Sequence, residues 1–313
     1  SSAASDVYKR QESMNRYEQY IEIEAGEDAK KLNDALKRLY ISHRTFKRYY
    51  YRDLIRVDGK WVKHIDPVKK GSKISFRIPG SYTPIGLPAE APEVLYEDDM
   101  VFLLNKPAGI LTHESRNHFG VNLKDMVSTL FNEREIFEPV RFINRLDMDT
   151  SGIIMIAKHD IAQGYYQKLH DAGKIKKEYI MIAKSESPLT KKTTITTRIG
   201  RDEIGIKRKA VEEDEEGLDA KTIFTPLYFK NGYEILKAEI KTGRTHQIRV
   251  HLGTMGKVLL GDELYGGDKT LISRQALHSY RLRTFDLNGD KIDVFSEMPE
   301  DMKMVIRKIR DEL

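Results

Sequence analysis

The sequence predicts an α+β protein: a small basic module of two helices followed by strands, then a larger domain built on a mixed, largely antiparallel sheet. Three observations predict this fold. Beyond residue 92, apolar residues form many short, strand-like segments and few segments with helical spacing. These segments do not alternate strictly with helices, which argues against a doubly wound parallel sheet. Positive charge is concentrated in the first eighty residues, ahead of a Pro- and Gly-rich stretch.

Composition limits the class of protein. The chain has 313 residues, of which 40% are hydrophobic and 32% charged, and it contains no cysteine. Such a chain is globular, is long enough for two domains and has neither disulfides nor thiolate zinc sites. No apolar run approaches the roughly 18 residues that a membrane span needs. We therefore expect a soluble, cytoplasmic protein that has no membrane partner.

Four segments are predicted along the chain. The start is polar and lacks the apolar core of a secretory signal, so we expect residues 1–20 to be a disordered leader. Residues 21–80 are expected to form the basic module, residues 81–92 a stiff linker, and residues 93–313 the larger domain.

The module is strongly basic. Residues 30–77 carry 15 Lys and Arg against 4 Asp and Glu, a net +11, whereas the whole chain carries +5 and the remainder therefore −6. Such an uneven distribution favours a polyanionic partner, although an ordinary basic surface is the alternative. One helix is predicted from the apolar spacing of residues 32–39, and Ser42 is placed to cap a second that ends near Arg52.

Strands are predicted after these helices. IRVDGKWV predicts a hairpin that turns at Asp58-Gly59, and SKISFRIP alternates like a half-buried strand. Over about fifty residues this order resembles the RNA-binding domain named after ribosomal protein S-four. The resemblance implies that four side chains of the second helix contact RNA phosphates: Arg44, Lys47, Arg48 and Arg52. Residues 49–51 are all tyrosine and either stack on unpaired bases or pack in the core.

The larger domain is predicted to contain more strands than helices. Helices are expected over residues 123–131, 160–173 and 297–313. Strands are expected within residues 94–106 and over residues 152–158, 177–184, 193–200, 220–229, 233–240 and 246–252.

The segment RFINRLDMDTSGIIMIAKHD raises the question of chemistry, because Asp147 and Asp149 precede an uncharged apolar run. A calcium loop would need a Glu where Lys158 stands, so this reading is unfavourable. A plain turn explains single residues but not the Arg-Leu-Asp sequence. A nucleophilic carboxylate is the third possibility, and it needs a cationic partner to stay ionised when it is partly desolvated.

Six segments then occur in order: NKPAG, RLDMDTSGIIMIAK, KKEYIMIAK, TGRTHQIRVHL, GDELYGG and LHSYRLRTFDL. Together they resemble the RluA-type pseudouridine synthase family over about residues 94–290. The resemblance implies the pseudouridine synthase fold and isomerisation of uridine in RNA to pseudouridine, with neither cofactor nor metal. It implies an RNA partner, ribosomal RNA rather than transfer RNA, and we expect a monomer.

The resemblance also assigns residues. Asp147 is the catalytic aspartate, Tyr179 packs on the target base, and Arg249 pairs with Asp147. Asp147 either adds to the sugar or base or abstracts a proton from the sugar. Arg145 resembles the arginine that fills the gap left by a flipped base, and Ile248 matches an apolar pocket wall. The remaining substrate contacts are expected from Thr150, Arg244 and His246.

Some residues receive a structural role or depart from the family pattern. Thr150, Ser151 and Gly152 are expected to shape the catalytic loop. Asn105, Lys106, Pro107 and Gly109 form the family's opening loop, and Asp262 is expected to form a turn. Asn144 stands where the family often has histidine. The competing classes are a non-catalytic RNA-binding or ribosome-assembly protein, and a retaining glycosidase or phosphodiesterase that would need a second carboxylate.

Overall fold

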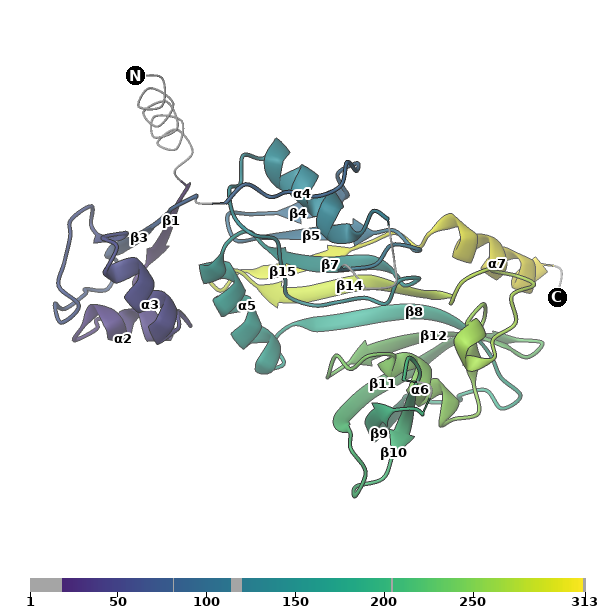
Figure 1. The fold of residues 1–313 in the computed structure, drawn as a ribbon. Helices are drawn as coiled ribbons and strands as arrows, with labels where there is room; N and C mark the ends of the chain where they lie inside the picture. The colour runs from purple at the N-terminus through teal and green to yellow at the C-terminus, as the bar shows by residue number, and fades with distance from the viewer. Residues whose placement is uncertain (1–18, 81, 114–119, 204, 312–313) are drawn as a thin grey trace.

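A computed structural model describes residues 19–80, 82–113, 120–203 and 205–311 (Figure 1). These residues form a three-stranded sheet with two helices and a twelve-stranded sheet with further helices. Most strand pairs of the large sheet are antiparallel, which confirms the predicted α+β class. No helix of the described residues is long and apolar enough to cross a membrane.

The small sheet has the order β1 (Gln19–Glu24), β3 (Lys73–Ile78) and β2 (Ile55–Val57). Two predicted helices are confirmed as α2 (Leu32–Arg38) and α3 (His43–Tyr50). Ser42 caps α3, because its Oγ accepts a hydrogen bond of 3.1 Å from the Thr45 amide.

Two expectations for this part of the chain need correction. The turn at Asp58-Gly59 is present, with φ of 50° and 76°, but a single bridge between Val57 and Lys60 closes it, and no two-stranded hairpin extends from it. The strand β2 instead pairs with β3, which is 16 residues further along the chain. β1 was not predicted and begins at Gln19, inside the expected leader. The rest of that leader, residues 1–18, lies outside the described residues.

The large sheet runs from edge to edge through β10 (Arg208–Val211), β9 (Thr193–Arg201), β11 (Leu218–Lys230), β12 (Tyr233–Ile240), β8 (Lys176–Lys184), β14 (Leu277–Phe285), β7 (Ser151–Ala157), β5 (Val101–Lys106) and β4 (Glu93–Glu97). Three short strands pair beside this path: β6 (Arg141–Phe142), β13 (Val258–Leu259) and β15 (Lys291–Phe295). Long helices flank the sheet as predicted: α4 (Leu123–Glu133), α5 (Asp160–Asp171) and α7 (Glu300–Asp311).

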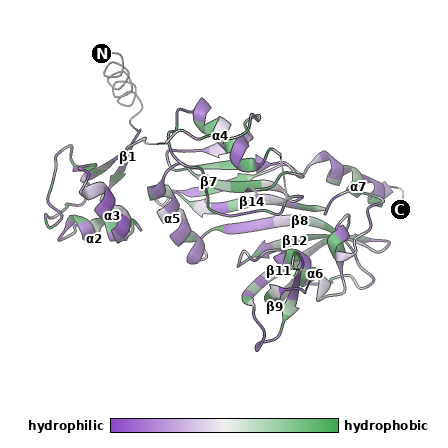
Figure 2. Ribbon diagram, in the orientation of Figure 1, coloured by the Kyte–Doolittle hydropathy of each residue, from purple (hydrophilic) through white to green (hydrophobic). Residues whose placement is uncertain are grey.

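The uncharged run after the loop that contains Asp147 is β7, a hydrophobic strand inside the sheet (Figure 2). Successive side chains of a strand point to opposite faces. Ile153 and Met155 accordingly enter a core that includes Ile161 of α5, whereas Ile154 enters a core that includes Leu130 of α4. Burial on both faces explains why this segment does not alternate with polar residues.

Gly152 joins the loop that contains Asp147 to this strand. Ser151 and Gly152 pair in parallel with His278 and Ser279 of β14. Gly152 has a φ of +106°, and a Cβ built on it would lie 2.2 Å from the Ser279 carbonyl oxygen. Only glycine fits this close approach, so the Thr-Ser-Gly sequence reflects the backbone geometry at the start of β7.

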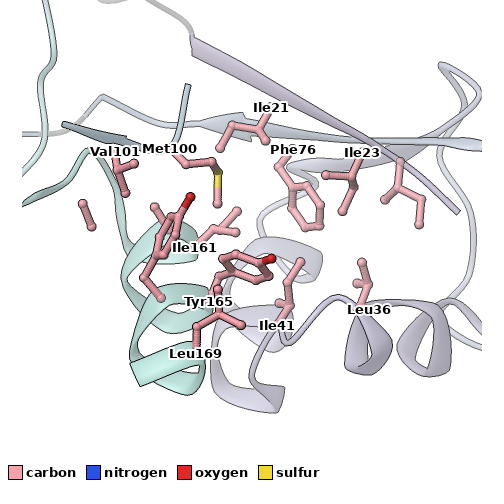
Figure 3. Close-up of a cluster of buried hydrophobic side chains, with 14 of the residues drawn as sticks. Ile21, Ile23, Leu36, Ile41, Phe76, Met100, Val101, Ile161, Tyr165 and Leu169 are labelled. Atoms are coloured by element: carbon pink, nitrogen blue, oxygen red, sulfur yellow. The ribbon is translucent and has the colours of Figure 1, made fainter. Parts of the chain in front are cut away.

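The basic module packs directly on the larger domain (Figure 3). One hydrophobic core contains Ile21 and Phe76 of the module together with Met100, Ile161 and Tyr165 of the larger domain. At the same interface, the Tyr49 hydroxyl donates a hydrogen bond of 2.7 Å to Asp160 Oδ1, and Arg48 forms an ion pair with Asp160.

The segment expected to be a linker also packs on the larger domain. Its described residues, 82–92, form neither helix nor strand. The Leu87 amide donates to Asp125 Oδ1 at 3.0 Å, and the Asn132 side chain donates to the Pro84 carbonyl at 3.1 Å. The proline-rich stretch therefore lies along α4.

The segment HQIRVHL was predicted to be a strand, and this prediction is wrong. It forms the helix α6 (Gln247–Gly253), which follows His246 in a left-handed conformation with φ of 56°. Apolar residues alternate at Ile248, Val250 and Leu252, but residues 247–252 are all buried. An element buried on every side has no solvent-facing stripe from which its period can be recognised.

Candidate active site

A cavity of ≈ 290 Å³ opens in the larger domain where three segments meet. Its lining comes from the loop that contains Asp147, from β8 at Tyr179, and from residues 243–249, which lead from β12 into α6. The three residues predicted to be catalytic, Asp147, Tyr179 and Arg249, all line this cavity, although they lie far apart in the sequence.

A buried lysine holds the Asp147 loop in place. Lys106, at the end of β5, is fully buried, and its Nζ donates hydrogen bonds of 2.8, 2.7 and 3.1 Å to the carbonyls of Pro107, Met148 and Thr150. The opening-loop residue Lys106 therefore fixes the backbone on both sides of Asp149. The ammonium group of Lys106 thus occupies backbone carbonyls of the loop that could otherwise serve as calcium ligands.

Further hydrogen bonds shape the same loop. The Thr150 amide donates to the Asp147 carbonyl at 3.1 Å, which closes a turn. The Thr150 Oγ1 accepts a hydrogen bond of 2.8 Å from Gln275, and Thr150 is only 2% exposed. Thr150 lines the cavity, but its hydroxyl is engaged with the protein, which favours a role in loop geometry.

Arg249 connects two carboxylates. Its Nε and Nη2 donate hydrogen bonds of 2.7 Å to Asp262, and its Nη1 donates one of 3.3 Å to Asp147 Oδ2. Burial disfavours the charged guanidinium, but the hydrogen bonds and charge of Asp262, with the charge of Asp147, raise the pKa of Arg249 above its ordinary value. Arg249 is therefore a fixed cation beside Asp147.

Asp262 was expected to form a turn, and this interpretation is incomplete. Its backbone does accept turn hydrogen bonds from the amides of Tyr265 and Gly267. Its side chain is buried and forms the bidentate pair with Arg249. The guanidinium of Arg249 also lies 4.6 Å from the centre of the Tyr265 ring.

His246 completes the polar side of the cavity. Its Nε2 lies 3.9 Å from Asp147 Oδ2, and its Nδ1 lies 3.1 Å from the Tyr265 hydroxyl. Burial lowers the pKa of His246, and the charge of Asp147 offsets only part of this effect. At neutral pH the imidazole is therefore uncharged, and Arg249 is the cation that faces Asp147.

Tyr179 and two aliphatic side chains form the apolar side. Tyr179 is 4% exposed on β8, and burial together with the nearby charge of Asp147 raises its pKa. Its ring is therefore a neutral, flat surface beside a carboxylate. Ile248 and Leu277 are also buried and line the cavity, as expected for Ile248.

Arg145 and Arg244 lie at the rim. Both side chains line the cavity and are exposed. The Nε of Arg244 donates a hydrogen bond of 3.0 Å to the Asp219 carbonyl.

Asn144, which departs from the family pattern, supports the strand beneath the loop. Its Oδ1 accepts a hydrogen bond of 2.9 Å from the Met155 amide. Its Nδ2 is buried and has no hydrogen-bond partner among the described residues.

The predicted RNA contacts of the module do not reach the cavity, because residues 44–52 belong to the separate helix α3 and its end. Arg44, Lys47 and Arg52 are exposed, and Arg48 pairs with Asp160. Of the three tyrosines, Tyr49 is buried in the core, whereas Tyr51 is 77% exposed. Among the described residues, no group of three or more His, Asp or Glu side chains could hold a metal ion.

Several lining residues were not predicted from the sequence. His113, His170, Lys177 and Gln247 all line the cavity, and Tyr265 supports Arg249. Tyr265 lies in GDELYGG, Lys177 in KKEYIMIAK and Gln247 in TGRTHQIRVHL, so these three were within recognised segments. His113 and His170 belong to no such segment, and only the fold brings them to the site.

Known proteins are similar to this chain in sequence and in fold. Residues 100–254 match the family described as RNA pseudouridylate synthase. The uncharacterised RNA pseudouridine synthase YhcT of Bacillus subtilis is 34% identical over 257 residues, which cover 81% of this chain and 84% of that protein. The ribosomal large subunit pseudouridine synthase D of Zymomonas mobilis is 29% identical over 235 residues, covering 69% and 72%.

A solved structure supports the fold. The human RNA pseudouridylate synthase domain containing 4 superposes with a TM-score of 0.58 at 20% identity, covering 70% of this chain and 93% of that one. At this identity the similarity concerns the fold alone.

Proposed function

Since the chain belongs to the RluA-type family of RNA pseudouridine synthases and isomerises uridine in RNA to pseudouridine, we propose that the cavity beside Asp147 is its active site. The observation that carries this proposal is the chain of side chains Asp147, Arg249 and Asp262. Arg249 is held by Asp262 and donates a hydrogen bond to Asp147, which orients this carboxylate in the cavity.

The cavity takes one nucleotide rather than a helix. Its volume of ≈ 290 Å³ lies near the lower end of the range of about 300–1,000 Å³ for small-ligand pockets. The target uridine must therefore leave its stack, which costs a few kcal/mol. Stacking on Tyr179 and filling of the vacated space by Arg145 offset part of this cost.

The isomerisation breaks the bond between N1 of uracil and C1′ of ribose, and forms a bond between C5 and C1′. C5 loses a proton and N1 gains one, so the atoms balance without an oxidant, a cofactor or a metal. Asp147 acts on the nucleotide as a nucleophile or as a base towards the sugar, and both roles require the ionised carboxylate.

We assign ribosomal RNA as the substrate. The support is the sequence similarity to proteins named ribosomal large subunit pseudouridine synthase D. Such a substrate places the enzyme with the ribosome in the cytoplasm.

Nucleotide-resolution mapping of pseudouridine in cells with and without the gene tests the substrate. We expect one or a few uridines of large-subunit ribosomal RNA to lose the modification, while transfer RNA is unchanged. Loss confined to transfer RNA would refute the substrate assignment but leave the enzymatic activity intact.

The basic module supplies a second RNA contact, through the exposed side chains Arg44, Lys47 and Arg52 on α3 and at its end. In the S-four-like arrangement these cations contact phosphates, which gives affinity that depends on salt and not on sequence. Arg48 has a different role, because its ion pair with Asp160 helps to hold the module on α5.

Replacing Arg44, Lys47 and Arg52 together with Gln should weaken RNA binding and lower the slope of log K against log salt by about 2 to 3. Binding is measured at several salt concentrations. The matched control replaces Arg307, Lys308 and Arg310 with Gln; these three exposed cations lie on α7, at the opposite end of the molecule from α3 (Figure 1). Equal slopes for the two triple variants would show that α3 is not an RNA contact. Substitution is preferable to deletion of the module, because deletion would expose the shared core around Tyr165.

A further inference from the structure

One buried lysine at the active site lacks the oxygen partners that the other buried lysines have. Four lysines of the described residues are buried: Lys106, Lys158, Lys177 and Lys257. Lys106 donates to three carbonyls, Lys158 to Glu97 at 2.8 Å, and Lys257 pairs with Glu234 at 2.7 Å. Among the residues that the structure describes, the Nζ of Lys177 has a single hydrogen-bond partner, His170 Nε2 at 3.3 Å.

The amine of Lys177, which has no counter-charge within the described ranges, faces the cavity. Lys177 and Tyr179 are two residues apart on β8, so their side chains leave the same face of the strand about 7 Å apart along it. Both residues line the cavity. A buried charge is unfavourable without a counter-charge, so this position is suited to an anion that arrives with the substrate.

Two further groups surround Lys177. His170, on α5, and Arg244, which follows β12, also line the cavity, and the charge of Arg244 acts on His170. His170 is uncharged at neutral pH, because burial and the charge of Lys177 lower its pKa. Its Nε2 therefore accepts from the ammonium group of Lys177 and orients it. Burial lowers the pKa of Lys177 to about 8, so the amine still carries most of its charge at pH 7.

Gly243 has no side chain, so the space beside Lys177 Nζ and His170 Nε2 stays open. A Cβ at this position would lie 3.6 Å from Lys177 Nζ and 3.9 Å from His170 Nε2. The residue has no positive φ that would strain another side chain. A larger side chain at position 243 can therefore fill the space beside Lys177 Nζ and His170 Nε2 without disturbing the backbone.

We propose that Lys177 and Arg244, with His170 orienting the ammonium group of Lys177, form an oxyanion subsite that binds a phosphate group of the target nucleotide while Tyr179 and Asp147 hold its base and ribose. This inference rests on the proposed active site. A phosphate of a nucleotide lies one ribose away from the base, which matches a subsite next to Tyr179. Lys177 is then a positioning residue, which places the ribose against Asp147 by holding the backbone beside it.

The test compares uridine with uridine 3′-monophosphate and uridine 5′-monophosphate as probes of the intact protein. Binding is followed by calorimetry and by the side-chain NMR signal of Lys177. For the wild type, we expect one monophosphate to bind roughly tenfold to a hundredfold more tightly than uridine, as for charge-assisted hydrogen bonds. Lys177→Met should abolish this preference while leaving the affinity for uridine within about twofold.

Two further variants make the comparison decisive. Lys176→Met removes the exposed neighbouring lysine on the opposite face of β8 and should keep the full preference. Gly243→Val keeps Lys177 but fills the space beside its Nζ, so this variant should lose the preference for the monophosphate over uridine. It also provides a test if Lys177→Met does not fold.

Equal binding of uridine and both monophosphates, a preference that survives Lys177→Met, or no binding of either monophosphate would overturn the subsite. The proposed function is judged separately, by pseudouridine formation in RNA. A wild type that makes no pseudouridine but shows the phosphate preference would refute the function and retain the anion subsite.

Discussion

Replacing Asp147 with Asn is expected to lower the rate of pseudouridine formation by about 10⁴-fold or more, the scale seen when one member of a catalytic unit is removed. Asn has nearly the same shape, but it can neither attack as an anion nor accept a proton. The side chain of Asp147 is 22% exposed at the cavity, so the loss of its charge should change stability little. RNA binding and folding should therefore remain close to those of the wild type.

The measurement is single-turnover formation of pseudouridine in a large-subunit ribosomal RNA transcript, with binding and thermal unfolding of each variant measured in parallel. Asp149→Asn is the matched control, because it makes the same chemical change two residues away on a side chain that does not line the cavity. We expect Asp149→Asn to retain activity. Turnover near the wild-type rate in Asp147→Asn would remove Asp147 from the chemistry.

Replacing Arg249 with Met should abolish activity and also destabilise the fold by about 3–5 kcal/mol, the usual cost of removing one partner from a buried ion pair. Asp262 is 2% exposed, and within the described part of the chain its carboxylate accepts side-chain hydrogen bonds from Arg249 alone. Without Arg249 this carboxylate is left buried and uncompensated.

A double variant separates the structural role of Arg249 from its catalytic role. Asp262→Leu added to Arg249→Met removes the stranded carboxylate, so we expect denaturant unfolding to show that much of the lost stability returns. Activity should stay absent, because Asp147 still lacks its cation. A double variant that regained activity along with stability would mean that Arg249 has no role beyond folding.

The residues proposed to be catalytic could be singled out because they lie in segments that resemble those of a known family. Asp147, Tyr179 and Arg249 each occur in such a segment, and the structure brings all three to one cavity. Burial of β7 on both faces also followed from its uncharged run. These features depend on neighbouring residues, which the sequence displays directly.

What the sequence did not predict depends on contacts between distant segments. Asp262 stands in a sequence typical of a turn, and no neighbouring residue indicates that its carboxylate forms an ion pair with Arg249. The strand predicted for residues 246–252 was wrong because the residues of α6 are buried on all sides. His170 contributes to the cavity only because α5 ends beside β8.

The docking of the basic module is a further long-range feature. Arg48 belongs by sequence to a basic helix face, yet its partner Asp160 lies 112 residues further along the chain. Tyr49 is one of three consecutive tyrosines, and only the fold distinguishes this buried side chain from the exposed Tyr51. Sequence composition could indicate a polyanion-binding module, but it could not indicate which of its cations hold the module on the larger domain.

The central claim is that the carboxylate of Asp147, in the cavity shared with Tyr179 and Arg249, makes pseudouridine in RNA. The most direct measurement maps pseudouridine at nucleotide resolution in cells lacking the gene, complemented with the wild type, Asp147→Asn or Asp149→Asn at equal protein levels. We predict that the missing modification returns with the wild type and with Asp149→Asn, and stays absent with Asp147→Asn. Its return with Asp147→Asn would contradict the account.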